Sequence, residues 1–335
     1  MKNRRFFTAL CIVLTATVLI GGAAAFAENA DNGIEYNYLS AQECADTLRG
    51  LDTYYDNISM KCLQFFMQEK DADVKRYIEY SAAQARDFTE AERKLLDRTV
   101  ESIENKLDAA GMHLPENKTL SFAKTTMQEA SGAGGYTHGT TVFLSESRLA
   151  AWVENEESYK YTAEVTVAHE LFHCLTRNNP EFRRAMYSFI GFTVTDADFD
   201  IPEYVREQMI ANPDVGHHDS YAVFTVNGEK KNCYLVFLSE NDFEKPGDSF
   251  FEGMYTGLVD IEEGRLYSYA DASDFYTVLG ENTDYCEDPE ECMATNFSYA
   301  VTFGMNGPDG HGYKTPEIIR NIIAYMQNGA ETVIK

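Results

Sequence analysis

The sequence has few basic residues for its length, and this excludes one broad class of partners. It contains 28 Lys and Arg against 54 Asp and Glu, which gives a formal net charge of −26 at pH 7. A surface so negative repels phosphate backbones, so we expect no nucleic acid among the partners. The same charge keeps an exported protein soluble, which is the simpler reason for it.

The sequence also lacks a second long apolar run. The first one, from Phe6 to about Gly21, follows three basic residues and precedes Ala25-Phe26-Ala27. This order is typical of a cleaved export signal. We therefore predict a signal peptide over residues 1–27 and a secreted or cell-surface protein with no membrane span after cleavage. The alternative is an uncleaved anchor, because the run is nearly long enough to cross a bilayer.

No Cys-x-x-Cys pair is present, so a cysteine-based zinc or redox site is not indicated. Six of the seven cysteines follow the expected signal. An even number in an exported chain permits disulfides, although their connectivity does not follow from the sequence. Cys286 and Cys292 flank an acidic segment, and we consider a disulfide between them as one way to brace it.

The order of the expected elements indicates an α+β chain without internal repeats. A loose leader is expected up to about residue 38. Thr89 and Glu92 have the spacing of a capping box at the start of a long helix. The remaining patterns predict helical structure over 40–111, strands at 120–126 and 140–144, helices at 158–177 and 180–189, β structure over 221–278, and helices at 289–303 and 316–326.

The run His169-Glu170-Leu171-Phe172-His173 lies within the expected helix 158–177. Two histidines four residues apart project from one face of a helix, where their rings can bind one Zn²⁺. Zinc lowers the pKa of water to about 7, and Glu170 is placed to take the proton as the water attacks a carbonyl. The alternative is two helical histidines with an unrelated glutamate between them.

A third protein ligand has to come from elsewhere in the chain. No further histidine follows His173 at the spacing of the longer zinc motifs. The remaining option is a glutamate on a second helix, and Glu290 and Glu291 are both candidates. Pro289 suits the first turn of a helix, and acids suit its positive end. Because this segment is far from His169 along the chain, the β region between them would be an insertion.

The two segments resemble the gluzincins, the thermolysin-like clan of zinc metallopeptidases. The resemblance is closest to a bacterial branch with His-Glu-Leu-Phe-His early and Pro-Glu-Glu-x-x-Ala-x-Asn-Phe later, and it extends from about residue 136 to the C-terminus. It implies one catalytic Zn²⁺ with Glu291 as the third ligand and Glu290 as the fallback. Thr295 departs from the pattern, because gluzincins often have an acid there that orients a zinc histidine. Another acid would have to replace it, or metal affinity would be lower.

Two further expectations follow from the resemblance. Residues 141–144 match the zincin edge strand that holds an extended substrate, although they also fit an ordinary core strand. Gluzincins commonly supply a Tyr or His downstream of the third ligand to stabilise the oxyanion, which implies His311 or Tyr313 here. The alternative is that both lie on a surface loop.

The resemblance implies a zincin-like α+β fold. We expect a helical N-terminal region over 28–115 and a catalytic domain over 116–335, with a β-rich insertion at about 218–280 between the two metal-binding helices. The predicted function is a secreted zinc peptidase that acts on a peptide or protein. The alternatives are a zinc amidase acting on cell-wall peptide and a catalytically weak surface binding protein on the same scaffold. The oligomeric state stays open.

Overall fold

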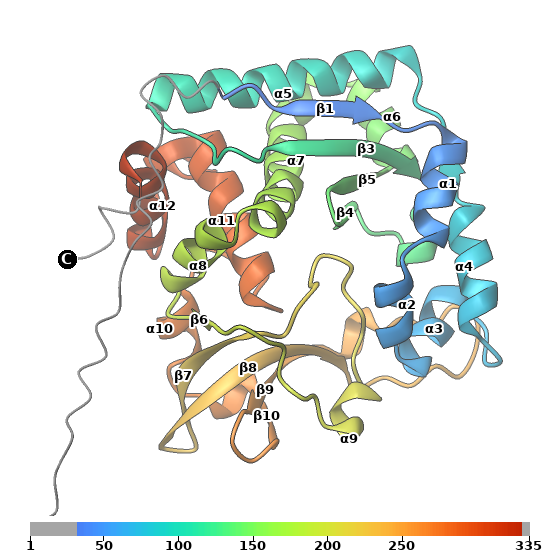
Figure 1. Cartoon of the computed structure of the whole chain (residues 1–335), viewed down its shortest axis with the longest axis vertical. Helices are drawn as coiled ribbons and strands as arrows, with labels where there is room; N and C mark the ends of the chain where they lie inside the picture. Colours follow the sequence, from blue (N-terminus) through green and yellow to red (C-terminus); the bar gives the residue numbers. More distant parts are fainter. Residues whose placement is uncertain (1–31, 330–335) are drawn as a thin grey trace, which may run out of the picture.

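Two sheets lie in opposite halves of the molecule, a mixed sheet with the long helices in one half and an antiparallel sheet in the other (Figure 1). The computed structural model describes residues 32–329, so the expected signal peptide lies outside the described residues. Within that range no helix has the length and apolar character that a membrane span requires. The chain is therefore α+β, as the order of the sequence patterns predicts.

The mixed sheet has the order β1-β3-β5-β4, and β2 pairs with β3. β1 and β5 both run parallel to β3, whereas β4 runs antiparallel to β5 and forms one edge of the sheet. The strands are β1 Glu35–Tyr38, β2 Ala85–Arg86, β3 Thr119–Thr125, β4 Gly135–His138 and β5 Thr141–Ser145.

The start of the chain corrects one prediction. A loose leader was expected up to residue 38, but β1 pairs with β3 over its whole length. The rings of Tyr36 and Tyr38 each lie 5.7 Å from the ring of Phe122. Aromatic packing across strands is a strong contribution to pairing, and it binds this segment to the sheet.

The position of residues 141–144 decides between two interpretations. They fitted either a substrate-holding edge strand or an ordinary core strand, and the core strand is confirmed, because β5 lies between β3 and β4 and is almost fully buried. The edge is β4, a strand of four residues joined to β5 by a turn at Gly139, whose φ is +57°. Glycines cluster just before and at the start of β4, a composition that is typical of a loop, so no sequence pattern indicated this strand.

The long helix expected after Thr89 and the helices expected at 158–177, 180–189, 289–303 and 316–326 are present within two residues of those bounds, whereas three shorter helices, at 146–154, 203–206 and 275–279, were not expected. The capping box at Thr89 and Glu92 is confirmed, with both reciprocal hydrogen bonds present. The helices are α1 Ala41–Arg49, α2 Asp52–Asn57, α3 Met60–Met67, α4 Val74–Ala82, α5 Glu90–Ala110, α6 Glu146–Glu154, α7 Glu156–Asn178, α8 Pro180–Ser188, α9 Glu203–Arg206, α10 Phe275–Leu279, α11 Pro289–Phe303 and α12 Pro316–Asn328.

The antiparallel sheet has the order β10-β9-β8-β7-β6 and comes between α8 and α11 along the chain. The hairpin expected at Asn227-Gly228 is confirmed, and both residues have positive φ, at +50° and +88°. The strands are β6 Thr193–Val194, β7 Ser220–Val226, β8 Glu229–Ser239, β9 Met254–Asp260 and β10 Leu266–Ser268.

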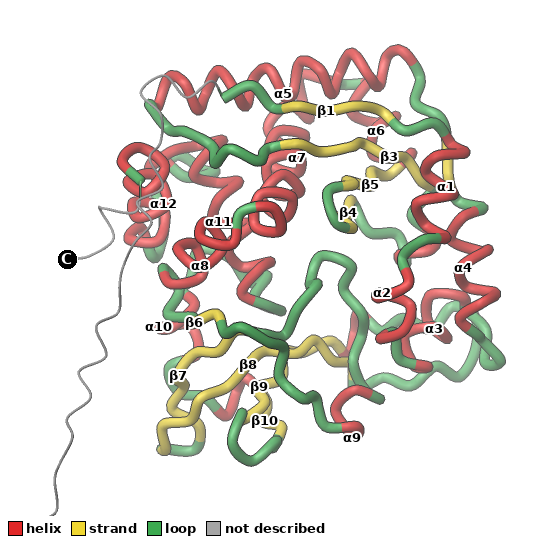
Figure 2. The backbone as a smooth tube through the Cα atoms, viewed as in Figure 1, coloured by secondary structure: helices red, strands yellow, loops and turns green. Residues whose placement is uncertain are grey.

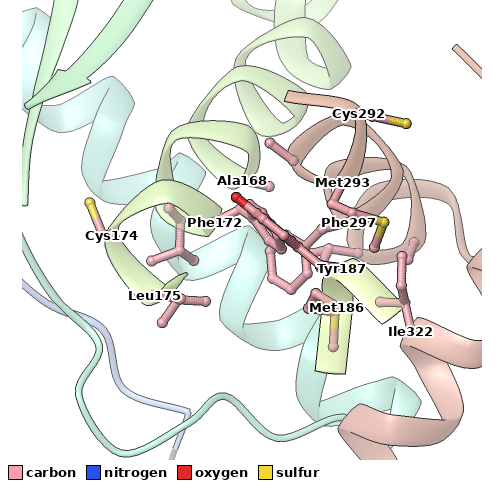
Figure 3. Close-up of a cluster of buried hydrophobic side chains, with 14 of the residues drawn as sticks. Ala168, Phe172, Cys174, Leu175, Met186, Tyr187, Cys292, Met293, Phe297 and Ile322 are labelled. Atoms are coloured by element: carbon pink, nitrogen blue, oxygen red, sulfur yellow. The ribbon is translucent and has the colours of Figure 1, made fainter. Parts of the chain in front are cut away.

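An apolar core holds α7 against α11 (Figure 3). The rings of Phe172 on α7 and Phe297 on α11 lie 5.4 Å apart, and both side chains are fully buried. Burying such a side chain contributes about 1.5–3 kcal/mol. Because Phe172 lies within residues 169–173, this contact also fixes which part of α11 lies beside that turn of α7.

Candidate metal centre

The same turn of α7 carries His169 and His173, and both histidines face the first turn of α11. His169 Nε2 lies 3.0 Å from Glu291 Oε2, and His173 Nε2 lies 3.8 Å from the same oxygen. The His173 and Glu291 side chains are fully buried, and that of His169 is 16% exposed. Donor atoms of all three residues lie within 4.8 Å of one another, so the structure brings together the three expected ligands.

The N-terminus of α11 explains how two acids are held in the interior. Asp288 caps the helix by accepting a hydrogen bond from the Glu290 backbone N–H, and Pro289 occupies the first turn. Glu290 and Glu291 then lie at the positive end of the helix, which favours carboxylates. Burial alone would raise the pKa of Glu291, but the hydrogen bond to His169 and the charges of both histidines lower it to about 2.

Glu290 lies on the other side of the His173 ring and does not meet the three donor atoms. Its Oε1 is 2.9 Å from His173 Nδ1 and accepts a hydrogen bond of 2.6 Å from the Thr176 hydroxyl. The Tyr187 hydroxyl donates to its other oxygen. Glu290 therefore orients His173. This is the role that the resemblance assigns to an acid at position 295.

The remaining nitrogen of His173 has no hydrogen-bond partner among residues 32–329, although it is buried. A buried polar atom without a partner costs about 1–3 kcal/mol. Since Glu290 occupies Nδ1, Nε2 points toward the carboxylates that surround it. Burial lowers the pKa of His173, but the charge of Asp214 and the hydrogen bond to Glu290 outweigh burial, so the pKa is raised. The site thus attracts a positive charge to this nitrogen.

The spacing of the donor atoms fits a zinc ion. With Zn–N and Zn–O distances near 2.0–2.1 Å, two ligands of a tetrahedral ion lie about 3.3 Å apart. The separations of 3.0 and 3.8 Å from Glu291 Oε2 to the two imidazoles lie on either side of this value. Two imidazoles and one carboxylate are the donor set of many catalytic zinc sites.

Glu170 lies beside the cluster and against the edge strand β4. Its side chain is buried, and Oε2 accepts a hydrogen bond of 2.7 Å from the Thr137 hydroxyl. A Cβ at Gly135 would lie 3.0 Å from Glu170 Oε1, so the strand reaches this carboxylate only because position 135 has no side chain. Burial, followed by the charge of Asp214, raises the pKa of Glu170 to about 8.

The sequence did not indicate a second contribution, which comes from the α9–β7 loop, residues 207–219. Figure 2 shows this loop rising from the half with the antiparallel sheet toward β4. Asn212 Nδ2 donates to Glu291 Oε1 over 2.6 Å. Asp214 is buried, and its Oδ1 lies 3.8 Å from His173 Nε2. These residues reach the centre by tertiary folding alone, so no local pattern could have identified them.

The structure does not bring His311 or Tyr313 to the cluster. Tyr313 donates from its hydroxyl to the carbonyls of Tyr299 and Gly304, at the C-terminal end of α11. His311 is exposed in the following loop. Twelve residues of helix separate that end from Glu291, which is about 18 Å at 1.5 Å per residue. Neither residue therefore lies near enough to the cluster to be the expected oxyanion donor.

Tyr285 lies at the edge of the cluster, next to His169. Its ring centroid is 6.3 Å from that of His169, and the residue is 40% exposed at the edge of the site. The pKa of its phenol is raised, first by loss of hydration and then by nearby carboxylates, with Glu291 foremost. A protonated phenol there can donate a hydrogen bond. Tyr285 precedes Glu291 in the sequence, whereas the resemblance directed attention downstream.

The cysteine pair beside the centre is not bonded. Cys286 and Cys292 are both buried free thiols whose sulfur atoms lie 3.8 Å apart. The other four cysteines in the described range are also buried and free. The N-terminus of α11 is therefore held by packing and by its cap, without a disulfide.

Comparison with known proteins adds no relative. No family model matches the chain, and neither a curated protein nor a solved structure matches it. The interpretation of the centre therefore depends on its geometry.

Proposed function

We propose that the chain is a secreted zinc-dependent peptidase with a zincin-like fold, in which His169, His173 and Glu291 hold the metal ion. The observation that carries this proposal is the buried Nε2 of His173, which has no hydrogen-bond partner in the described range and faces Glu291 Oε2 at 3.8 Å. Acids alone are common on protein surfaces. A buried imidazole nitrogen that has no partner and is surrounded by buried carboxylates is uncommon. A divalent cation would satisfy both the nitrogen and the carboxylates.

A zinc ion at this position would polarise a substrate carbonyl and acidify water. The chain supplies the other requirements of amide hydrolysis. Glu170 lies beside the cluster, where its carboxylate can accept the proton of the attacking water. Glu290 holds the His173 ring in one orientation through Nδ1. Tyr285 can donate to the oxygen that gains charge in the transition state.

The edge strand supports a peptide as the substrate. β4 is antiparallel to β5 and passes directly beside Glu170, to which the Thr137 hydroxyl is bonded. The Thr137 backbone N–H is directed away from β5, because it donates to Asp214. An extended peptide can pair with such an edge through its backbone, which places a scissile amide next to the base. An edge strand beside a helix with this motif also supports the zincin-like fold.

The proposal is tested by metal content and by one substitution. Protein purified without added metal should contain about one zinc ion per chain, measured by plasma mass spectrometry. Glu170→Gln should keep the zinc and lower the hydrolysis of a mixed peptide library by about 10²–10⁴-fold, because the base is lost. Glu157→Gln changes an exposed glutamate on the same helix and is the matched control. Unchanged hydrolysis in Glu170→Gln, or absence of bound zinc, would overturn the proposal.

A further inference from the structure

The α9–β7 loop places a fourth protein carboxylate at the centre. Asp214 Oδ1 is 3.8 Å from His173 Nε2, the same distance that separates this nitrogen from Glu291 Oε2. Asp214, His173 and Glu170 form a second group whose donor atoms all lie within 4.8 Å. His173 Nε2 belongs to both groups, and a single nitrogen binds a single ion. Asp214 therefore approaches the ion that the first group holds, from the side of Glu170.

This position is the one that the reaction needs for water. The attacking water has to lie between the ion and Glu170, within hydrogen-bond reach of the base. A catalytic zinc site leaves this position open, whereas a site with four protein ligands is closed. Asp214 is only 6% exposed, so its carboxylate occupies the interior of the site.

The same carboxylate also covers the edge strand. Asp214 Oδ1 accepts a hydrogen bond of 2.5 Å from the backbone N–H of Thr137. In the proposed function this N–H is the group that pairs with a substrate backbone. One side chain therefore blocks two places that a peptide requires, the coordination position beside Glu170 and the adjacent N–H of β4.

The loop is held in this position from several directions. Arg177, at the end of α7, donates to the carbonyls of Asp214 and Pro213 at 2.9 and 3.4 Å. Asn212 accepts from the Asp214 backbone N–H and donates to Glu291. The loop also lines a cavity of about 650 Å³, with Leu51, Tyr54 and Phe237 among the other lining residues. This space allows the loop to move without disrupting the helices that hold the ligands.

We propose that Asp214 is a fourth ligand that closes the metal centre and that the α9–β7 loop is a built-in inhibitor, which a peptide must displace. The inference rests on the proposed function. It predicts that the protein binds zinc tightly and hydrolyses peptides slowly, in proportion to the small fraction of molecules whose loop is displaced.

The experiment compares the full chain with Asp214→Ala and Asp214→Asn. The amide in Asp214→Asn keeps an acceptor for Thr137 N–H, so this variant preserves the fold if alanine does not. Glu207→Ala removes an exposed acid from the same loop and is the matched control. Each protein is loaded with Co²⁺, and its visible spectrum is recorded before and after addition of a small hydroxamate. Zinc dissociation constants and hydrolysis of the peptide library are measured alongside.

A closed centre should give a wild-type spectrum that barely responds to the hydroxamate, whereas both Asp214 variants should respond at low concentration. The variants should also bind zinc at least about tenfold more weakly, since a ligand is lost, and hydrolyse peptides at least about tenfold faster. The inference is overturned if all proteins bind zinc equally and respond alike, or if Asp214→Asn keeps its zinc and hydrolyses more slowly. Failure of the wild type to bind any zinc would instead overturn the proposed function.

Discussion

The two halves of the molecule contribute to the centre in different ways. The half with the mixed sheet supplies the two imidazoles, Glu170 and the two glutamates of α11, all on long helices joined by a buried aromatic contact. The half with the antiparallel sheet supplies Asn212 and Asp214 on a loop. Side chains on packed helices keep their geometry, whereas a loop can leave and return. Under the proposed function, the first half would supply the main metal ligands, and the second would add a weaker contribution to metal affinity and control access to the centre.

The largest expected effect tests this division at Glu291, whose two oxygens face different halves. Glu291→Ala should lose zinc by at least about a hundredfold in affinity, because it removes the carboxylate that faces both histidines. Asn212→Ala removes the contact to Glu291 Oε1 from the loop, and we expect about a tenfold loss. Competition with a fluorescent chelator measures both. Equal losses in the two variants would contradict the division.

A smaller effect, on kcat, is expected for Tyr285 at the edge of the site. Tyr285→Phe should lower kcat by about 10–100-fold and leave zinc affinity unchanged, because the phenol acts on the charge that develops in the transition state. Tyr313→Phe is the matched comparison at the far end of α11, where the hydroxyl bonds to backbone carbonyls. It should lower stability slightly and leave kcat unchanged. Equal kcat in Tyr285→Phe and the wild type would remove this residue from the mechanism.

The smallest effect is on stability after chelation of the metal. Burial, followed by the charge of a nearby acid, raises the pKa of Glu170 from 4.5 to about 8 and that of Glu287 from 4.5 to about 9. The pKa values of His169 and His173 are raised from 6.5, since the neighbouring carboxylates outweigh burial. Between pH 6 and 9 the folded chain therefore holds protons that the unfolded chain has lost, so folding becomes less favourable as pH rises.

Urea titrations of the chelated protein should show a free energy of unfolding that falls continuously from pH 6 to pH 9. The zinc-loaded protein should show a flatter profile, because the cation stabilises the ionised carboxylates and the neutral imidazoles. A chelated protein that becomes more stable as pH rises over this range would contradict the raised pKa values of Glu170 and Glu287.

The sequence predicted what depends on local spacing. His169 and His173 lie on one face of α7 because helical period places them there, and the acids follow Pro289 at the start of α11 as expected. The order of helices and the hairpin at Asn227-Gly228 also follow from local patterns. Such features need no knowledge of the tertiary fold.

The rest depends on contacts between distant segments. The orientation of His173 by Glu290 needs the register between α7 and α11, and the approach of Asp214 needs the position of a whole sheet. β4 is too short and too close to glycines for a periodic pattern to appear. Residue types alone could not separate Glu290 from Glu291, because adjacent helical residues point in different directions and only the partner helix decides between them.

Position 135 has a consequence for how this protein can vary. A methyl group there would press on Glu170 Oε1 from 3.0 Å and on the Phe143 carbonyl oxygen from 3.3 Å. The carbonyl belongs to a paired strand and cannot yield, so Glu170 would have to retreat. The absence of a side chain at Gly135 therefore provides the space that the Glu170 carboxylate occupies. A single carbon atom added to the backbone there would shift Glu170 without touching His169, His173 or Glu291.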